Sequence, residues 1–266
     1  MKEKIKNSIY GFIVGDALGV PYEFKQNIGL TKLEMVGYGT YNQPKGTWSD
    51  DTSFLLATMD SDLTNIEELT DNFRDIVIVG DYTPHGKMFD IGLTTYKNLF
   101  GLPSNLQDDN GSLMRILPYA FINNINKQDI INSSYITHKS PLAATCCLVY
   151  VEWVKQTLNG DYSYQEIFDS IVNENNFTNL FDNIFRPSTK GYVADSLLIV
   201  LDVIKKAKSY QEGVLEAINL GGDTDTHAAL IGGVLAIKYD DFTPFINDIQ
   251  NKELVDFIIN KFIEKI

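Results

Sequence analysis

The chain has 266 residues, of which 44% are hydrophobic, and this suffices for one globular domain with a sizeable core. Its formal net charge of −13 argues against a protein that holds nucleic acid through a broad basic surface. No segment is apolar for long enough to span a membrane, and Gly15, Asp16 and Gly19 interrupt the N-terminal apolar stretch, which argues against a signal peptide. We therefore expect one domain over residues 1–266, in a monomeric cytoplasmic protein without a membrane or nucleic-acid partner.

Apolar residues recur at three- and four-residue steps along most of the chain, which is the spacing of a helix face. This periodicity predicts helices over residues 5–20, 51–62, 66–79, 90–99, 163–175, 189–208, 240–248 and 251–264. Further helices are expected in the apolar runs that follow polar turns near residues 110, 138 and 223. No alternating run is long enough for a sheet, so the sequence predicts an all-α fold whose polar residues gather where helices begin.

The two cysteines, Cys146 and Cys147, are adjacent inside an apolar segment. Such a pair is typical of small buried hydrophobic residues rather than of a disulfide or a zinc site. This interpretation agrees with a reducing intracellular compartment.

An acidic stretch from Gly221 to Thr226 places Asp223 and Asp225 at the start of an apolar helical run. One aspartate there can cap the helix by accepting hydrogen bonds from free backbone N–H groups. The second aspartate and the threonine hydroxyls need another explanation, because several hard oxygens beside a buried helix repel one another unless a cation joins them. We therefore favour ion binding over capping alone.

A second acidic cluster has the same form. Ser49, Asp50, Asp51 and Thr52 precede the apolar run that begins at Phe54. One acidic segment cannot fill the coordination shell of a divalent cation. The two helix starts, which are far apart in the chain, therefore predict one shared site.

Other polar positions are candidates for ligand contact. Glu23 follows the proline that ends the first helix, and its aromatic neighbours could raise its pKa for acid–base work, although such a residue is often simply exposed. The turn at Asn110, Gly111 and Ser112 offers free N–H groups to an anion, and it is equally typical of a helix cap.

Two basic residues leave alternatives open. Arg115 could reach an anionic ligand or pair with an acid. His138 stands at a helix start, where a structural histidine and a ligand contact are equally reasonable.

Taken together, these segments resemble the ADP-ribosylglycohydrolase family, which includes hydrolases that remove ADP-ribose from proteins. The resemblance covers nearly the whole chain. It is carried, in order, by Gly15-Asp16-Ala17-Leu18-Gly19 with Glu23, Gly46 to Thr52, Asn110 to Arg115, Thr137-His138 with Pro141, and Gly221 to Thr226. Any one motif is weak, whereas all of them in this order are highly specific. The resemblance implies a compact single-domain orthogonal helical bundle.

The resemblance also implies two magnesium ions, or manganese ions in their place, at the centre of a cleft. Their ligands would be Ser49, Asp50, Asp51, Asp223, Asp225 and Thr226. Glu23, Asp51 and Asp223 would be the catalytic residues, and the substrate-binding residues would be Gly86, Asn110, Gly111, Ser112 and His138. Ser49 stands where the family usually has threonine, and it keeps the hydroxyl ligand. Asp109 stands where a glycine often precedes the Asn-Gly pair.

The implied reaction is magnesium-dependent hydrolysis of the glycosidic bond between ADP-ribose and an acceptor. Divalent cations can position ribose hydroxyls and acidify a water, while an acid and a base assist cleavage at the anomeric carbon. The acceptor stays open at this point: it is an arginine or serine side chain of an ADP-ribosylated protein, another acceptor, or part of a small ADP-ribose derivative.

Three alternative functions compete with this one. An enzyme of isoprenoid diphosphates needs an Asp-Asp-x-x-Asp motif, which Asp50-Asp51-Thr52-Ser53-Phe54 does not provide. A phosphohydrolase of the His-Asp type needs a histidine followed by aspartate, and none of the 3 histidines is. A catalytically silent ADP-ribose-binding or structural member of the same family is the third. The presence of all six candidate metal ligands and Glu23 favours the hydrolase.

Overall fold

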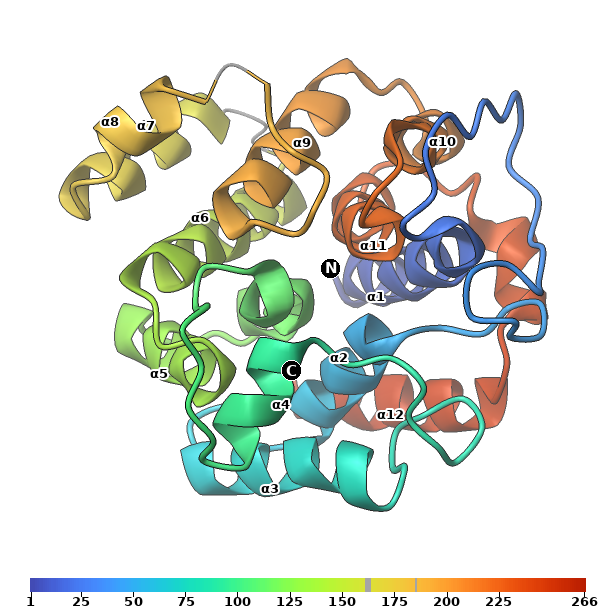
Figure 1. The fold of residues 1–266 in the computed structure, drawn as a ribbon, viewed down its shortest axis with the longest axis horizontal. Coiled ribbons are helices and arrows are strands. Elements are labelled where there is room, and N and C mark those ends of the chain that lie inside the picture. The colour runs from blue at the N-terminus through green and yellow to red at the C-terminus, as the bar shows by residue number, and fades with distance from the viewer. Residues whose placement is uncertain (161–163, 185) are drawn as a thin grey trace.

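A computed structural model describes residues 1–160, 164–184 and 186–266. Within these ranges the regular elements are helices, and one isolated bridge between Asp109 and Tyr192 is the strand-like pairing that the structure contains. The predicted all-α fold is confirmed (Figure 1).

The α-helices are α1 (Lys2–Gly19), α2 (Asp50–Asp60), α3 (Ile66–Ile78), α4 (Leu93–Leu99), α5 (Lys127–Thr137), α6 (Pro141–Leu158), α7 (Tyr164–Glu174), α8 (Thr178–Asp182), α9 (Val193–Lys206), α10 (Tyr210–Leu220), α11 (Thr224–Leu235) and α12 (Lys252–Lys265). Short 3₁₀ helices lie between them: η1 (Val20–Tyr22), η2 (Asn110–Arg115), η3 (Leu117–Ala120) and η4 (Thr243–Asp248). No helix in the described ranges is long and apolar enough to cross a membrane. Cys146 and Cys147 are buried, unpaired thiols of α6, as the apolar segment predicts.

Helices α1 and α11 pack side by side through the middle of the bundle (Figure 1). Small residues make this approach possible. A Cβ atom added to Gly15 would lie 2.2 Å from the Ala228 carbonyl oxygen, and one added to Gly19 would lie 2.5 Å from Asp225 Cα. The glycines of α1 therefore mark close helix packing, and this packing brings the end of α1 to the start of α11.

Helix α2 begins against the buried side of α1. Ser49 caps it by accepting a hydrogen bond from the Asp51 N–H at 3.2 Å. Asp16 of α1 accepts hydrogen bonds from the Ser49 N–H at 3.0 Å and from the Thr52 N–H and hydroxyl at 3.0 and 2.6 Å. Because a carboxylate satisfies free N–H groups at a helix start, Asp16 fixes the first turn of α2 relative to α1.

The structure differs from the predicted helices at several places. The helix expected over 240–248 is the short 3₁₀ helix η4, and residue 163 of the helix expected over 163–175 lies outside the described residues. The helix expected to continue from the Asn110 turn to residue 121 is broken into η2 and η3, because Pro118 lacks an N–H and its ring crowds the preceding turn. Helices α5 and α10 were not predicted. The buried residues of α5 are one apolar residue, Ile130, and three hydroxyl residues, Ser133, Ser134 and Thr137. The sequence of α5 therefore shows no apolar stripe at helical spacing.

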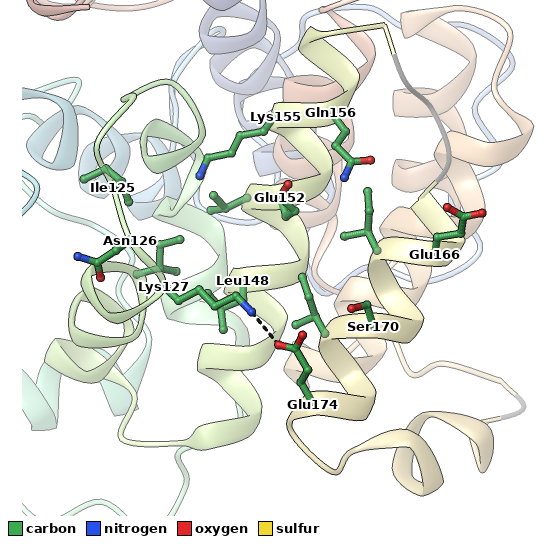
Figure 2. Close-up of a pocket in the computed structure, with 14 residues that line it drawn as sticks. Ile125, Asn126, Lys127, Leu148, Glu152, Lys155, Gln156, Glu166, Ser170 and Glu174 are labelled. Carbon is green, nitrogen blue, oxygen red and sulfur yellow. Dashed lines mark hydrogen bonds and ion pairs between the residues drawn. The ribbon is translucent and has the colours of Figure 1, made fainter.

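A groove of about 670 Å³ lies between α6, α7 and the start of α5 (Figure 2). Its rim is charged, and Lys127 and Glu174 form an ion pair of 2.7 Å across it. None of the candidate site residues lines this groove. The candidate site lies elsewhere, where the starts of α2, η2 and α11 meet.

Candidate active site

The candidate site residues converge on an open cleft of about 330 Å³. Eight of the residues expected from the sequence line it: Glu23, Asp50, Asp51, Asn110, Gly111, Asp223, Asp225 and Thr226. They come from the end of η1 and the starts of α2, η2 and α11. Two acidic clusters more than 170 residues apart in sequence thus share one cleft, in the arrangement that the sequence predicts.

The start of α2 contributes two buried carboxylates. Asp51 Oδ2 accepts hydrogen bonds from the Ser49 hydroxyl at 3.3 Å and from the Thr226 hydroxyl at 3.2 Å. Asp51 Oδ1 is buried and has no hydrogen-bond partner among the described residues. Burial first, and then the charges of neighbouring aspartates including Asp16, raise the pKa of Asp51 well above its ordinary range.

The start of α11 contributes Asp223 and Asp225. Asp223 Oδ2 accepts a hydrogen bond of 2.6 Å from the Asn110 side-chain amide, which links this cluster to the turn that begins η2. Burial, followed by the charge of Glu23, raises the pKa of Asp225 well above its ordinary range.

Glu23 is held beside α11 by the backbone around it. The Phe24 N–H donates to the Gly222 carbonyl oxygen at 2.6 Å, and the Gly222 N–H donates to the Lys25 carbonyl oxygen at 3.1 Å. Gly222 has φ of +77°, a left-handed conformation that favours glycine. This pairing brings one carboxylate oxygen each of Glu23, Asp223 and Asp225 within 4.8 Å of one another.

Glu23 is buried, which excludes the alternative of a simply exposed side chain. Burial, and then the charge of Asp90, raise its pKa to about 8. Glu23 Oε2 is a second buried carboxylate oxygen for which the described residues provide no hydrogen-bond partner.

Two residues beside Glu23, Asp90 and Tyr41, are not among the candidates from the sequence. Asp90 lines the cleft just before α4, and burial raises its pKa to about 6. Tyr41 comes from a loop, and its ring centroid lies 5.3 Å from that of Phe89. Burial and the charges of Asp90 and Glu23 raise the pKa of Tyr41. Asp90 could have been found, because it precedes the hydroxyls of Thr94 and Thr95 at a helix start, as the other acids do.

Most carboxylates of the cleft lack a basic partner, whereas Asp109 pairs with His138. In the part of the chain that the structure describes, none of Glu23, Asp50, Asp51, Asp223 and Asp225 forms an ion pair with a basic side chain. Clustered buried carboxylates with unpaired oxygens are costly unless protons or cations neutralise them. Their hard oxygens are the ligands that divalent cations such as Mg²⁺ prefer.

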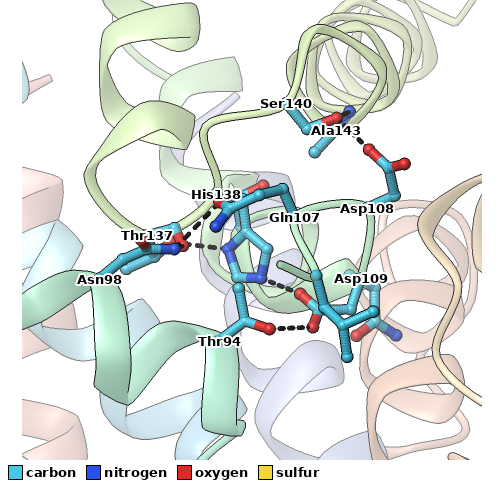
Figure 3. Close-up of polar contacts among 12 residues, drawn as sticks. Thr94, Asn98, Gln107, Asp108, Asp109, Thr137, His138, Ser140 and Ala143 are labelled. Atoms are coloured by element: carbon cyan, nitrogen blue, oxygen red, sulfur yellow. Dashed lines mark hydrogen bonds and ion pairs between the residues drawn. The ribbon is translucent and has the colours of Figure 1, made fainter. Parts of the chain in front are cut away.

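His138 lies outside the lining of the cleft, under the turn at Gly111. Figure 3 shows its ring between Thr137 and Asp109. Both of its ring nitrogens are engaged: Nδ1 contacts the Thr137 hydroxyl at 3.0 Å, and Nε2 pairs with the Asp109 carboxylate. The Thr94 hydroxyl donates to the other Asp109 oxygen at 2.6 Å. A Cβ atom added to Gly111 would lie 2.7 Å from His138 Cε1, so the imidazole directly supports the turn.

Three further candidates also lie outside the lining. Ser112 is buried, where its hydroxyl accepts a hydrogen bond of 2.9 Å from Ser134. Ser49 is buried behind Asp51. Gly86 is exposed in a loop, and apart from its chain neighbours no described residue places an atom within 4 Å of a Cβ atom built on it.

Arg115 meets neither expectation from the sequence. It is fully buried and donates to the Ser133 hydroxyl at 2.9 Å, the Ser133 carbonyl oxygen at 2.8 Å and the Thr137 hydroxyl at 2.9 Å. Its guanidinium also lies 4.5 Å from the centroid of the Phe73 ring. Arg115 therefore ties η2 to α5, with neutral partners instead of an acid or an anionic ligand.

Comparisons with known proteins agree with this arrangement. The model of the family described as ADP-ribosylglycohydrolase matches residues 1–241. A protein of Pseudomonas putida named ADP-ribosylarginine hydrolase is 25% identical over 264 residues, covering 89% of this chain and 71% of its own length. A protein of Rhodospirillum rubrum named ADP-ribosyl-(dinitrogen reductase) glycohydrolase is 25% identical over 263 residues, covering 89% of this chain and 86% of its own length.

A solved structure has the same fold. It is titled ADP-ribosylglycohydrolase-related protein complex, and it superposes with a TM-score of 0.78 at 20% identity, covering 99% of this chain and 98% of that one. The family model matches most of the chain, and all five motifs lie within the matched range. The chain therefore belongs to the ADP-ribosylglycohydrolase family, and it is a hydrolase of the class that cleaves glycosidic bonds of ADP-ribose.

Proposed function

We propose that this protein is a magnesium-dependent hydrolase that releases ADP-ribose from modified arginine side chains of proteins. The observation that carries the proposal is the convergence of buried, unpaired carboxylate oxygens from two helix starts on one open cleft. The family contributes the class of reaction. The metal is inferred from the cleft itself, and the acceptor from the cleft and from one relative named as an ADP-ribosylarginine hydrolase.

The donor set fits a hard divalent cation. Asp51 Oδ1 is buried without a partner, and the oxygens of Glu23, Asp223 and Asp225 are clustered. The residues that would hold the ions are Ser49, Asp50, Asp51, Asp223, Asp225 and Thr226. When bound, the ions act as Lewis acids that polarise the substrate and water. Mn²⁺ is the alternative ion, because it also takes carboxylate and hydroxyl oxygens.

Glu23 is the group we assign to proton transfer. Its Oε2 atom has no hydrogen-bond partner among the described residues, and the residue lines the cleft next to Asp223 and Asp225. Hydrolysis of a glycosidic bond needs one group that gives a proton to the leaving atom and one that takes a proton from water. Glu23 fills one of these roles, and the carboxylate of Asp51 or Asp223 assists.

The acceptor is best explained as arginine. Asp90 adds a carboxylate to the cleft beyond the six candidate metal ligands and Glu23. A carboxylate that is not used for a metal can pair with a guanidinium, whereas a serine acceptor offers no positive charge. One relative is named as an ADP-ribosylarginine hydrolase, in agreement with this choice.

The test is a release assay on purified protein. ADP-ribosylarginine and ADP-ribosylserine peptides and a small ADP-ribose derivative are each incubated with Mg²⁺, with Mn²⁺ and with a chelator, and free ADP-ribose is measured by chromatography. We expect release from the arginine peptide with Mg²⁺ and none after chelation. Glu23→Gln should lower kcat by about 100-fold or more while the protein still binds ADP-ribose. Glu253→Gln, on the exposed side of α12, is the matched control and should keep full activity.

Each contrary outcome has its own meaning. Release from serine but not arginine would overturn the acceptor. Full release in the presence of the chelator would overturn the metal requirement. Binding of ADP-ribose without release from any substrate would favour the catalytically silent alternative.

A further inference from the structure

Residues 189–191 form a short connection before α9 that touches both motifs of the cleft. The Thr189 carbonyl oxygen accepts a hydrogen bond of 2.8 Å from the Asp223 N–H, and the Gly191 carbonyl oxygen accepts one of 3.0 Å from the Asn110 N–H. The residue between them, Lys190, lines the cleft and is exposed. Its backbone is therefore held on both sides by the residues that form the site, although no motif of the sequence includes it.

The charge balance of the cleft makes this lysine unusual. Among the residues that line the cleft, the acidic ones are Glu23, Asp50, Asp51, Asp90, Asp109, Asp223 and Asp225. Lys190 is the one lysine or arginine among the described residues of that lining. Asp109 is paired with His138, and two divalent cations would neutralise four of the other six acids, so an excess of negative charge would still face the substrate.

The substrate of the proposed function is itself anionic, because ADP-ribose carries a diphosphate. A diphosphate that enters an acidic cleft needs a cation near it, and an ammonium group on a flexible stem is a common partner for phosphate oxygens. The exposed side chain of Lys190 can extend over the cleft from a fixed backbone. The six metal ligands and Glu23 are all neutral or acidic, so they cannot fill this role.

We propose that Lys190 is a specificity-determining residue that binds the diphosphate of the ADP-ribosyl group. This inference rests on the proposed function, because it takes ADP-ribose as the ligand. Lys190 contributes to affinity for the nucleotide part of the substrate and does not take part in bond cleavage. Its replacement should therefore raise KM and leave kcat nearly unchanged.

The experiment compares a charge series at this position by calorimetric titration with ADP-ribose in Mg²⁺. Lys190→Arg should bind within about threefold of the wild type, since the charge is kept. Lys190→Gln should weaken binding about tenfold, and Lys190→Glu should weaken it further. The difference between wild type and Lys190→Gln should shrink as NaCl is raised, because salt screens an exposed charge. Lys4→Gln, on the exposed face of α1, changes the net charge equally and is the matched control.

The outcomes separate this inference from the proposed function. Failure of the wild type to bind ADP-ribose would overturn both. Wild-type binding with equal affinity in Lys190→Gln would overturn the role of Lys190 alone. Lys190→Arg as weak as Lys190→Gln would show that charge is not what the position supplies, and would also overturn it. Thermal melting of each variant reports whether the fold is intact.

Discussion

Replacing Asp16 with asparagine tests how α1 holds the start of α2. Asp16 lies outside the lining of the cleft, and it contacts Ser49 and Thr52 on either side of the two carboxylates that begin α2. The substitution keeps the size of the side chain and removes its charge and one acceptor oxygen. Its effect on stability and on metal affinity therefore reports on this support and not on direct ligation.

The size of the effect follows from the hydrogen bonds. Asp16 Oδ2 accepts from the Thr52 N–H at 3.0 Å and hydroxyl at 2.6 Å, and Oδ1 accepts from the Ser49 N–H at 3.0 Å. In either orientation an asparagine NH₂ group would face at least one of these buried donors, which costs about 1–3 kcal/mol. Burial raises the pKa of Asp16 to about 6, although these hydrogen bonds act in the opposite direction. A neutral asparagine avoids part of this desolvation cost, which offsets some of the loss.

We expect Asp16→Asn to lower the free energy of unfolding by about 2 kcal/mol, and Tm by roughly 4–8 °C for a chain of this length. Urea unfolding followed by circular dichroism, with a chelator present, measures the first quantity. Asp202→Asn, an exposed partner of Lys206 on α9, is the control and should change stability by less than about 0.5 kcal/mol. Equal stability of Asp16→Asn and wild type would refute this account of the α2 start.

Three other predictions concern the cleft, the helix packing and the buried thiols. Asp51→Asn removes a carboxylate with an unpaired oxygen, so the metal-free variant should be as stable as wild type in urea, but Mg²⁺ should no longer raise its Tm; a clear loss of stability without metal would contradict this. Gly15→Ala should cost about 1–3 kcal/mol in the same assay, because its Cβ would lie 2.2 Å from the Ala228 carbonyl oxygen, and an unchanged midpoint would show that the helices can separate freely. Burial raises the pKa of Cys147 to about 11 and that of Cys146 also, so a thiol reagent at pH 8 should modify neither residue until urea is added. The thiol pKa values in the folded protein lie above those in the unfolded chain. The stability contributed by the protonated thiols is therefore complete below the ordinary thiol pKa and is lost as the pH rises through the folded pKa values. The free energy of unfolding should fall between these two pKa values.

The acidic clusters could be predicted from local sequence because each joins carboxylates and hydroxyls to the first turn of an apolar helix. Helix starts gather polar side chains near free N–H groups, and two such starts that each lack a partner imply a shared cation. The same local reasoning placed most helices, whose apolar stripes follow the helical period. It failed at Pro118, where one residue breaks an otherwise helical run, and at α5, which buries hydroxyls.

Positions that depend on contacts between distant segments could not be predicted in this way. His138 has a motif around it, but its burial beneath Gly111 follows from Asp109 and Thr94, which come from two other parts of the chain. Lys190 has no motif at all, and it reaches the cleft because its neighbours are bonded to the Asn110 and Asp223 segments. Contacts between segments that are far apart in the chain leave no periodic pattern of residue types in a single sequence.

The most direct measurement is a calorimetric titration of Mg²⁺ into chelator-treated protein, with Asp223→Asn and the control Asp202→Asn measured in parallel. The converging carboxylates predict saturable binding of Mg²⁺ to the wild type and to Asp202→Asn, and its loss or strong weakening in Asp223→Asn; the proposed function sets the expected stoichiometry at two. No binding of Mg²⁺ or Mn²⁺ to the wild type, or equal binding to Asp223→Asn, would contradict the assignment of the cleft as a metal-dependent active site.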